Sequence, residues 1–322
     1  MRAIRIRETG GPEVLKIEEV NLPPPGEGEA RIRQRAVGVN FIDTYHRTGF
    51  YPMPLPFTPG GEGAGEVVEV GPGVKDFKPG DRVAYAGPPG AYAEERNIPA
   101  RFLLKLPRAI SYDVAAAMML KGLTAQYLIR QTYRVKQGDW ILVHAAAGGV
   151  GQILCQWGRA LGAKVIGTVG SEEKVKIAKK AGARHTILYR QEDFAKRVGE
   201  ITNGQKCVVV YDGVGKATFP ASLDCLRPFG VFASFGSASG GIEAFDIGLL
   251  AQKGSLYATR PTLFTFIADR ARLETMGREL FRVVASGDVT IHIDRKLPLA
   301  EAAEAHRALE ARETTGSIVL VP

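Results

Sequence analysis

Short apolar runs, separated by glycine and proline, dominate the first hundred residues. Four of these runs, RAIRIRE (2–8), EARIRQRAVGVN (29–40), GEVVEVG (65–71) and DRVAYAG (81–87), show the apolar and polar alternation of half-buried strands. They predict a mainly β, barrel-like region. A helical pattern follows over 111–131, where Ser111 is a suitable N-cap.

From residue 140 the pattern changes to apolar runs that alternate with helical segments. The runs occupy 140–146, 164–170, 184–189, 207–212, 230–236 and 255–260. The helical patterns between them begin near Gly149, Glu172, Glu192, Lys216 and Ile247. Because the runs are too uniformly hydrophobic for one-sided exposure, they indicate a parallel sheet covered on both faces. The sequence therefore predicts an α/β, doubly wound nucleotide-binding domain.

The last sixty residues predict a helix over 266–289, a strand over 291–298, a helix over 300–314 and a final strand over 316–322. A terminal strand needs a sheet to join, so we expect this tail to return to the N-terminal domain. The predicted domains are 1–122 as the first part of a substrate domain, 123–260 as the nucleotide-binding domain, and 261–322 as the return.

Composition narrows the class of protein. The 322 residues are 45% hydrophobic and 24% charged, as in ordinary folded globular proteins. The N-terminus has no signal-peptide core and no apolar run is long enough to span a membrane, so we expect a cytoplasmic protein. The net charge of +8 favours anionic partners, which include nucleic acid, acidic surfaces and phosphorylated small molecules. Three cysteines without a CxxC pair suggest neither disulfides nor thiol redox chemistry.

The segment HAAAGGVGQ (144–152) is the strongest local motif. Its register is Ala146-x-Gly148-x-x-Gly151, so one glycine of the dinucleotide fingerprint G-x-G-x-x-G is replaced. A tight connection between strand and helix would also use such glycines. However, the turn opens the first of several strand and helix units, which favours a pyrophosphate held by the backbone N–H groups of Gly149 and Val150.

The end of the next strand indicates which dinucleotide binds. No carboxylate stands there to accept from a ribose hydroxyl, as NAD sites usually require. Instead Ser171 and Lys174 follow Gly170, and the third strand ends at Tyr189. Lys174 and Tyr189 facing a 2'-phosphate would favour NADPH over NADH. The alternative is that Ser171 caps a helix and Lys174 sits in its exposed first turn, beside two glutamates.

Several longer segments together resemble a known family. They are GGPEVL (10–15), NFIDTYHRTGFYP (40–52), GGEGAGEVVEVGPGV (60–74), KGLTAQY (121–127), HAAAGGVGQILCQWGRALGAKVIGTVG (144–170), VYDGVG (210–215), SFGSASG (234–240), QKGSLYATRP (252–261) and TGSIVLVP (315–322). In this order they closely resemble the NADPH:quinone oxidoreductases of the zeta-crystallin type, a zinc-free branch of the medium-chain dehydrogenase/reductase superfamily. The resemblance implies a GroES-like barrel domain formed by both chain ends, a central Rossmann domain, NADPH in the cleft between them, and a homodimer.

The resemblance also implies roles for individual residues. The positions that line the nicotinamide and substrate cleft, and are candidates for catalysis, are Asn40, Tyr45, Tyr51 and Thr124. The positions that bind the cofactor are Asn40, Gly148, Gly149, Val150, Gly170, Ser171, Lys174, Tyr189, Phe235, Ser237 and Arg312. Tyr45 and Tyr51 could hydrogen-bond a carbonyl or supply a proton, or their rings could simply form the wall of the pocket.

No metal site is predicted. Zinc alcohol dehydrogenases of the superfamily have cysteine where this chain has Asn40 and histidine where it has Gly61, and residues 85–110 contain no cysteine. His46 is the histidine nearest these motifs, and the spacing favours an edge position over ligation. Asp43 and Glu62 are interpreted as hydrogen-bonding groups of the barrel rather than an acid and base pair.

The missing zinc ligands point to a reaction class. Alcohol oxidation needs an alkoxide, which bound zinc helps to form, whereas a quinone accepts hydride with little activation. The sequence therefore predicts NADPH-dependent reduction of a quinone. Alternatives are an enone or alkenal reductase on the same scaffold and, from another class, an RNA-binding or structural crystallin-like protein, which only the positive charge supports.

Overall fold

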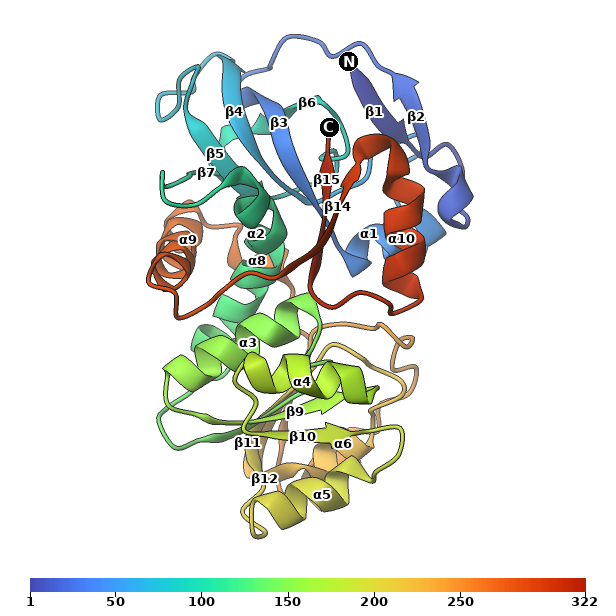
Figure 1. The fold of residues 1–322 in the computed structure, drawn as a ribbon, viewed down its shortest axis with the longest axis vertical. Helices are drawn as coiled ribbons and strands as arrows, with labels where there is room; N and C mark the ends of the chain where they lie inside the picture. The colour runs from blue at the N-terminus through green and yellow to red at the C-terminus, as the bar shows by residue number, and fades with distance from the viewer. The chain divides into compact units, whose positions relative to one another are not determined.

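The computed structural model describes all residues, 1–322, and divides the chain into two compact units (Figure 1). The first unit contains residues 1–123, 267–285 and 291–322, and the second contains residues 124–266 and 286–290. The chain therefore leaves the first unit near residue 123 and returns to it after residue 266.

The first unit is mainly β. Its seven-stranded sheet has the order β14-β15-β3-β4-β5-β7, with β6 paired to β3, and β1 and β2 form a separate antiparallel pair. The strands are β1 (Arg2–Arg5), β2 (Lys16–Glu19), β3 (Glu29–Val39), β4 (Glu62–Val70), β5 (Arg82–Ala86), β6 (Glu95–Pro99), β7 (Leu103–Lys105), β14 (Ile293–Pro298) and β15 (Ser317–Val321). Because β15 pairs antiparallel with β3, the predicted return of the tail to the N-terminal sheet is confirmed.

Four α-helices contribute to the first unit. They are α1 (Phe41–Thr48), α2 (Tyr112–Tyr127), α9 (Arg270–Ala285) and α10 (Ala302–Glu310), with single helical turns η1 (Pro12–Val14), η2 (Ala100–Phe102) and η4 (Leu299–Glu301) between other elements. The hydroxyl of Ser111 accepts from the N–H of Val114 at 3.3 Å, which confirms the predicted N-cap of α2. The last residues of α2 and the π-helical turn η3 (Leu128–Thr132) belong to the second unit.

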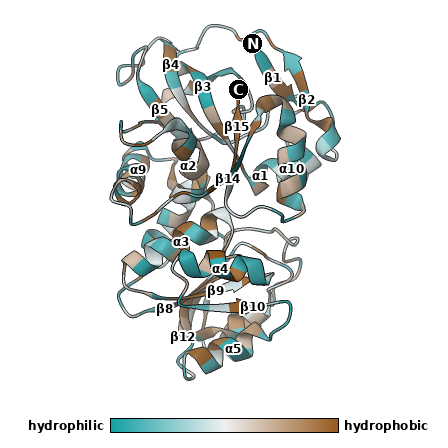
Figure 2. Ribbon diagram, in the orientation of Figure 1, coloured by the Kyte–Doolittle hydropathy of each residue, from teal (hydrophilic) through white to brown (hydrophobic).

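The second unit has a six-stranded parallel sheet of order β10-β9-β8-β11-β12-β13. Its strands are β8 (Trp140–Val143), β9 (Lys164–Val169), β10 (His185–Leu188), β11 (Cys207–Asp212), β12 (Leu226–Ser234) and β13 (Tyr257–Thr259). The strands β9 and β12 are coloured as hydrophobic in Figure 2. The predicted doubly wound Rossmann sheet is confirmed.

Helices cover both faces of this sheet. They are α3 (Gly149–Ala160), α4 (Glu172–Lys180), α5 (Phe194–Ile201), α6 (Ala221–Asp224), α7 (Gly248–Gln252) and α8 (Leu263–Phe266). On one face, Leu142 and Val210 belong to a buried cluster with Phe194 and Val198 of α5. On the other face, α3 approaches so closely that a Cβ on Gly158 would lie 3.0 Å from Ile141. Burial on both sides explains the uniformly apolar strands.

Two helix predictions are wrong in detail. No helix begins near Lys216, because the carboxylate of Asp212 accepts from the N–H groups of Val214 and Gly215 and from the Thr218 hydroxyl, which holds this segment in turns. The helix α6 begins only after Pro220.

The helix predicted over 266–289 is interrupted. Asp269 accepts from the N–H of Arg272 at 2.8 Å and so starts α9 separately from α8. At the other end, Gly287 has a φ of +80°, and α9 stops at Ala285. No helix has the length and apolar character that crossing a membrane would require.

Candidate functional site

The candidate cofactor residues of the second unit lie at the carboxyl ends of its parallel strands. The chain runs outward from β8 through β9 to β10, then returns to the other side of β8 to place β11. At such a reversal the loops after the two central strands diverge and leave a crevice for a nucleotide. Gly148, Gly170, Tyr189 and Phe235 follow β8, β9, β10 and β12 respectively.

The glycine turn after β8 meets the steric demands of the dinucleotide fingerprint. Gly148 is the N-cap of α3, and its N–H donates to the carbonyl of Ala145 at 2.9 Å. A Cβ on Gly151 would lie 2.3 Å from that carbonyl oxygen, so only glycine fits. The turn leaves the N–H groups of Gly149 and Val150 at the start of a twelve-residue helix, where an anion is favoured.

The residues predicted to bind the 2'-phosphate lie after β9 and β10. A Cβ on Gly170 would lie 3.5 Å from the Tyr189 hydroxyl, so the two predicted residues are neighbours. Ser171 is the N-cap residue of α4, but its side chain makes no capping hydrogen bond. The alternative in which Ser171 serves only as a cap therefore lacks its expected contact, and the exposed hydroxyl beside half-buried Lys174 suits a phosphate.

Phe235 and Ser237 lie in the loop after β12. The Phe235 ring packs on the backbone of Gly213, where a Cβ would lie 2.9 Å from it. The Ser237 hydroxyl accepts from the Arg260 guanidinium at 3.2 Å. The structure thus brings the loops after β11 and β12 together. Arg312 belongs to the first unit, just after α10, with a φ of +61°, and Thr124 is a buried residue of α2.

A buried polar network behind these loops was missed at the level of sequence. His144, directly after β8, is within 2.8 Å of the Thr168 hydroxyl and 3.0 Å of the Ser222 hydroxyl. Ser222 in turn donates to the Asp212 carboxylate at 3.0 Å. Asp212 also accepts from the Thr218 hydroxyl at 2.7 Å. The network ties the ends of β8, β9 and β11 together.

The chemistry of these groups fixes the proton on His144. Ser222 lies 3.0 Å from Asp212 and 3.0 Å from the Thr218 carbonyl, both of which only accept, so the proton of Ser222 points to one of them. Nε2 of His144 must therefore donate to Ser222, and Nδ1 accepts from Thr168. Burial lowers the pKa of His144 and keeps the ring neutral.

The network around Asp212 predicts that its loss weakens the use of NADPH and NADH alike, because it does not involve the 2'-phosphate. Replacing Asp212 with Ala frees the N–H groups of Val214 and Gly215 and loosens the loop after β11. We expect KM for both NADPH and NADH to rise by about tenfold or more, a loss of at least ~1.4 kcal/mol. Steady-state kinetics with both cofactors measures this. A loss confined to NADPH would contradict the assignment.

In the first unit, α1 and the segment after it form an aromatic cluster. The ring of Tyr45 lies 5.4 Å from Phe50 and 5.4 Å from Tyr51, and Phe50 lies 5.1 Å from Tyr51. The N–H of Tyr51 donates to the carbonyl of Tyr45 at 3.1 Å. Phe50 is 51% exposed. The three rings thus pack on one another through edge and tilted contacts, and Phe50 leaves part of this apolar cluster open to solvent.

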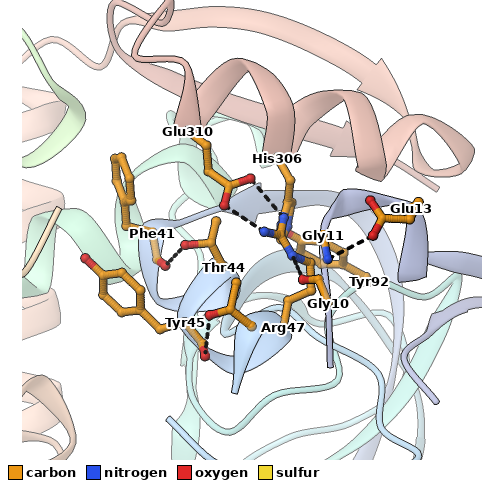
Figure 3. A network of polar contacts seen from close by, with 11 residues as sticks. Gly10, Gly11, Glu13, Phe41, Thr44, Tyr45, Arg47, Tyr92, His306 and Glu310 are labelled. Atoms are coloured by element: carbon orange, nitrogen blue, oxygen red, sulfur yellow. Dashed lines mark hydrogen bonds and ion pairs between the residues drawn. The ribbon is translucent and has the colours of Figure 1, made fainter. Parts of the chain in front are cut away.

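The other side of α1 is anchored by a buried arginine (Figure 3). Arg47, 1% exposed, donates to both carboxylate oxygens of Glu310 at 2.7 and 3.0 Å. It also donates to the carbonyl of Gly10 at 3.0 Å and contacts Nδ1 of His306 at 3.1 Å. Figure 3 shows the ring of Tyr45 on the side of α1 away from Arg47. The network therefore fixes the helix that carries Tyr45.

From Arg47 a chain of hydrogen bonds leads to the N-terminus of α1. Arginine only donates, so Nδ1 of His306 accepts and Nε2 donates to the Tyr92 hydroxyl, 3.1 Å away. Tyr92 then donates to Oδ2 of Asp43 at 3.0 Å, and the N–H of Asn40 donates to the same oxygen at 2.8 Å. Since Arg47 blocks Nδ1, the chain positions groups and cannot pass a proton inward.

The pKa values of Asp43 and His306 are shifted in opposite directions. Burial raises the pKa of Asp43 to about 7, despite the hydrogen bonds that it accepts. Its Oδ1 is buried and has no hydrogen-bond partner. Burial, with the nearby charge of Arg47, lowers the pKa of His306 to about 3. Both groups are thus neutral in the folded protein over mildly acidic pH.

These shifts predict two opposing pH dependences of the unfolding free energy. The folded state keeps a proton on Asp43 that the unfolded state has lost, so the contribution of Asp43 falls as pH rises from about 4 to 7. The unfolded state binds a proton at His306 that the folded state does not bind, so the contribution of His306 to stability falls as pH drops from about 6.5 to 3. In the wild type the two slopes largely cancel between about pH 4 and 6.5.

Single substitutions should expose each slope. Asp43→Asn removes the pH dependence that Asp43 contributes, so the variant should lose stability as pH falls. His306→Gln keeps an acceptor for Arg47 and a donor for Tyr92. It removes the pH dependence that His306 contributes, so the variant should lose stability as pH rises. Urea unfolding at three pH values in this window measures both. Equal slopes in the two variants would contradict the assigned shifts.

No three or more His, Cys, Asp and Glu side chains lie together in an arrangement that could hold a metal ion. Nδ1 of His46 is buried without a hydrogen-bond partner, and burial lowers the pKa of this histidine. The nearest ring is Tyr51, with centroids 6.3 Å apart. His46 therefore belongs to the aromatic cluster.

Comparison with known proteins first gives the class of protein to which this chain belongs. Residues 26–108 match the alcohol dehydrogenase GroES-like domain, and residues 149–271 match the zinc-binding dehydrogenase domain. The first match lies within the mainly β unit, and the second contains most of the Rossmann unit. The fold and the nucleotide-binding turn thus define a medium-chain dehydrogenase/reductase.

Full-length relatives then give the family. A quinone oxidoreductase of Pseudomonas aeruginosa is 53% identical over 100% of this chain and 99% of its own length. The crystal structure of Escherichia coli quinone oxidoreductase complexed with NADPH has a TM-score of 0.98 at 49% identity and covers 100% of both chains. A 2-haloacrylate reductase of a Burkholderia species is 48% identical over 98% of each chain. The chain belongs to the quinone oxidoreductase family.

Proposed function

We propose that this protein reduces quinones with NADPH. The observation that carries the proposal is the glycine turn of the second unit, which fits a pyrophosphate, together with the end of β9. That strand ends without a carboxylate, and the Ser171 hydroxyl and the Lys174 ammonium follow it, with Glu172 and Glu173 between them. The family supports the same reaction, because its named members are quinone oxidoreductases and one was solved with NADPH.

The residues of the second unit fit the two charged parts of NADPH. The N–H groups of Gly149 and Val150 would hold the pyrophosphate at the start of α3. Gly170, Ser171, Lys174 and Tyr189 would hold the 2'-phosphate. The chemistry that bound NADPH supplies is the transfer of a hydride to the quinone.

Three further predicted cofactor positions lie outside these two groups. Phe235 and Ser237 would contact the nicotinamide half, since both lie in the loop after β12. Arg312, which follows α10, would also contact the cofactor. These assignments follow the family positions, and cofactor-bound kinetics of single variants would test each.

The aromatic cluster around α1 would receive the quinone. Its rings exclude water and stack on a flat substrate, so the main contribution of the protein is to hold donor and acceptor in reach of each other. We propose that Tyr45 and Tyr51 form the wall of this pocket and that Asn40 and Thr124 lie at the nicotinamide. In this arrangement a quinone needs no Lewis acid to accept hydride.

A substrate panel tests the proposal. Purified protein is mixed with NADPH or NADH and with quinones, conjugated enals, 2-haloacrylate and alcohols, and the loss of reduced nicotinamide is followed by absorbance. We expect quinones to be reduced fastest. Faster reduction of 2-haloacrylate or enals would favour the second candidate, a reductase of conjugated double bonds, which the relation to 2-haloacrylate reductase supports.

We propose that the protein is a cytoplasmic homodimer. The edge strand β13 pairs only with β12, and its outer edge can accept a second copy. Large apolar side chains at this end of the sheet are exposed. Tyr257 of β13 is 63% exposed, and Phe229, whose N–H donates to the carbonyl of Gly254 shortly before β13, is 70% exposed. Light scattering should give a dimer for the wild type and a monomer for Tyr257→Asp. A monomeric wild type would refute the dimer.

A further inference from the structure

A buried ion pair holds the side chain of Asn40. Asn40 directly follows β3, and its amide nitrogen Nδ2 donates to Oε1 of Glu62 at 2.8 Å. The ammonium of Lys121 in α2 donates to the same oxygen at 2.6 Å and to the carbonyl of Val39 at 3.2 Å. Glu62 is thus shared between a candidate site residue and a buried cation.

Both members of the pair are buried, and each oxygen of the carboxylate accepts a hydrogen bond. Glu62 is 0% exposed and Lys121 is 6% exposed. The second carboxylate oxygen, Oε2, accepts from the N–H of Leu120 at 2.7 Å. The carboxylate also needs the glycine on β3 opposite it, because a Cβ on Gly38 would lie 2.2 Å from Oε1. This strand and this helix therefore leave a space shaped for Glu62.

Stability alone is a weak reason for such a pair. Moving two charges out of water costs about as much as their attraction returns, and apolar replacements are often equally stable. A geometric reason is at hand. A carboxylate only accepts, so Glu62 can bond only the amide nitrogen of Asn40, and the carboxamide cannot turn over. Asp43 holds the backbone N–H of the same residue at 2.8 Å.

We propose that Glu62 and Lys121 are positioning residues that orient the Asn40 carboxamide toward bound nicotinamide. The inference rests on the proposed function, in which Asn40 contacts the nicotinamide. Lys121 neutralises Glu62 and directs its Oε1 to Asn40, while Leu120 holds Oε2. Neither charged side chain needs to touch the cofactor.

The double substitution Glu62→Gln with Lys121→Met separates orientation from stability. With both charges removed, no charge is left buried without its partner, so the melting temperature should stay near that of the wild type. The Gln oxygen should accept from the Leu120 N–H, which turns its NH2 group toward Asn40 and reverses the carboxamide. We expect kcat/KM with NADPH to fall about tenfold, the value of roughly one hydrogen bond. The single variant Lys121→Met should instead melt at a lower temperature.

A double-mutant cycle gives the decisive comparison. In an Asn40→Ala background, the Glu62→Gln and Lys121→Met pair should cause no further loss of kcat/KM, because the side chain that it orients is gone. An equal further loss in that background would overturn the proposal, as would a double variant with wild-type activity. Ser317→Ala is the control, since its buried hydroxyl bonds Ala117 of α2 at 2.9 Å and should leave kcat/KM unchanged.

Binding of NADPH distinguishes failure of this inference from failure of the proposed function. The dissociation constant is measured without quinone, by fluorescence quenching, on the same four proteins of the cycle. If the wild type reduces no quinone, the proposed function fails. The binding cycle then decides the inference, because non-additive losses support it and additive losses overturn it.

Discussion

Replacing Arg47 with Met is expected to lower the unfolding free energy by about 3 kcal/mol. The guanidinium is buried and donates to Glu310, Gly10 and His306, so its loss leaves three acceptors without their donor. Because the Glu310 side chain is 35% exposed and can hydrate, we place the effect at the lower end of the range for broken buried pairs, about 3 to 5 kcal/mol. Urea unfolding followed by fluorescence measures it.

Arg35→Met is the matched control for Arg47→Met. It removes the same atoms from an ion pair with Glu66 at 3.2 Å, but the Arg35 side chain is 47% exposed. Exposed pairs contribute about 0 to 1 kcal/mol. If both variants lost the same stability, the buried network around α1 would not be the anchor described above.

Replacing Lys174 with Glu is expected to lower kcat/KM for NADPH about a hundredfold and to change that for NADH far less. A charge-assisted hydrogen bond to the 2'-phosphate contributes roughly 1.5 to 3 kcal/mol, and the new carboxylate adds repulsion. Since NADH has no such phosphate, it loses neither. Initial rates with each cofactor at limiting concentration give the ratio.

Lys176→Glu serves as the control for charge. Lys176 is exposed on the same helix, two residues further on, so the net charge changes equally while the position does not. We expect nearly unchanged selectivity in this variant. Equal losses with both cofactors in Lys174→Glu would mean that Lys174 does not contact the phosphate.

The parallel sheet could be predicted because its central strands, such as β8 and β11, are buried on both faces. Six apolar runs such as Trp140–Val143 and Cys207–Asp212 had no polar alternation, and only a covered sheet tolerates that pattern. The glycine turn was equally readable, since Gly151 is required by a carbonyl only a few residues earlier in the chain. Local chemistry of this kind is visible without a fold.

Long-range partners could not be predicted. Arg47 and His306 are 259 residues apart, and Lys121 and Glu62 are 59 apart. Asp43 and Glu62 were interpreted as hydrogen-bonding groups of the barrel. This is confirmed, but nothing in the sequence named Tyr92 and Lys121 as their partners. Which charged residue becomes buried depends on the pairing of distant strands and helices.

The two incorrect helix predictions have local causes that a pattern of apolar positions does not reveal. At Lys216 the carboxylate of Asp212 captures the backbone amides that a helix would need. At Asp269 a side chain caps a new helix inside an apolar pattern that looked continuous. In both cases a short acidic side chain competes with the backbone for hydrogen bonds.

Metal-independent reduction of a quinone by NADPH can be measured as the stoichiometry of turnover in the presence of a metal chelator. Purified protein, NADPH and a simple benzoquinone are mixed, and consumption of both is followed by absorbance. We expect one NADPH to be oxidised for each quinone reduced, at a rate that the chelator does not change, and no oxidation of alcohols with NADP+. Loss of activity with the chelator, or turnover of alcohols in place of quinones, would rule out a quinone reductase that works without a metal.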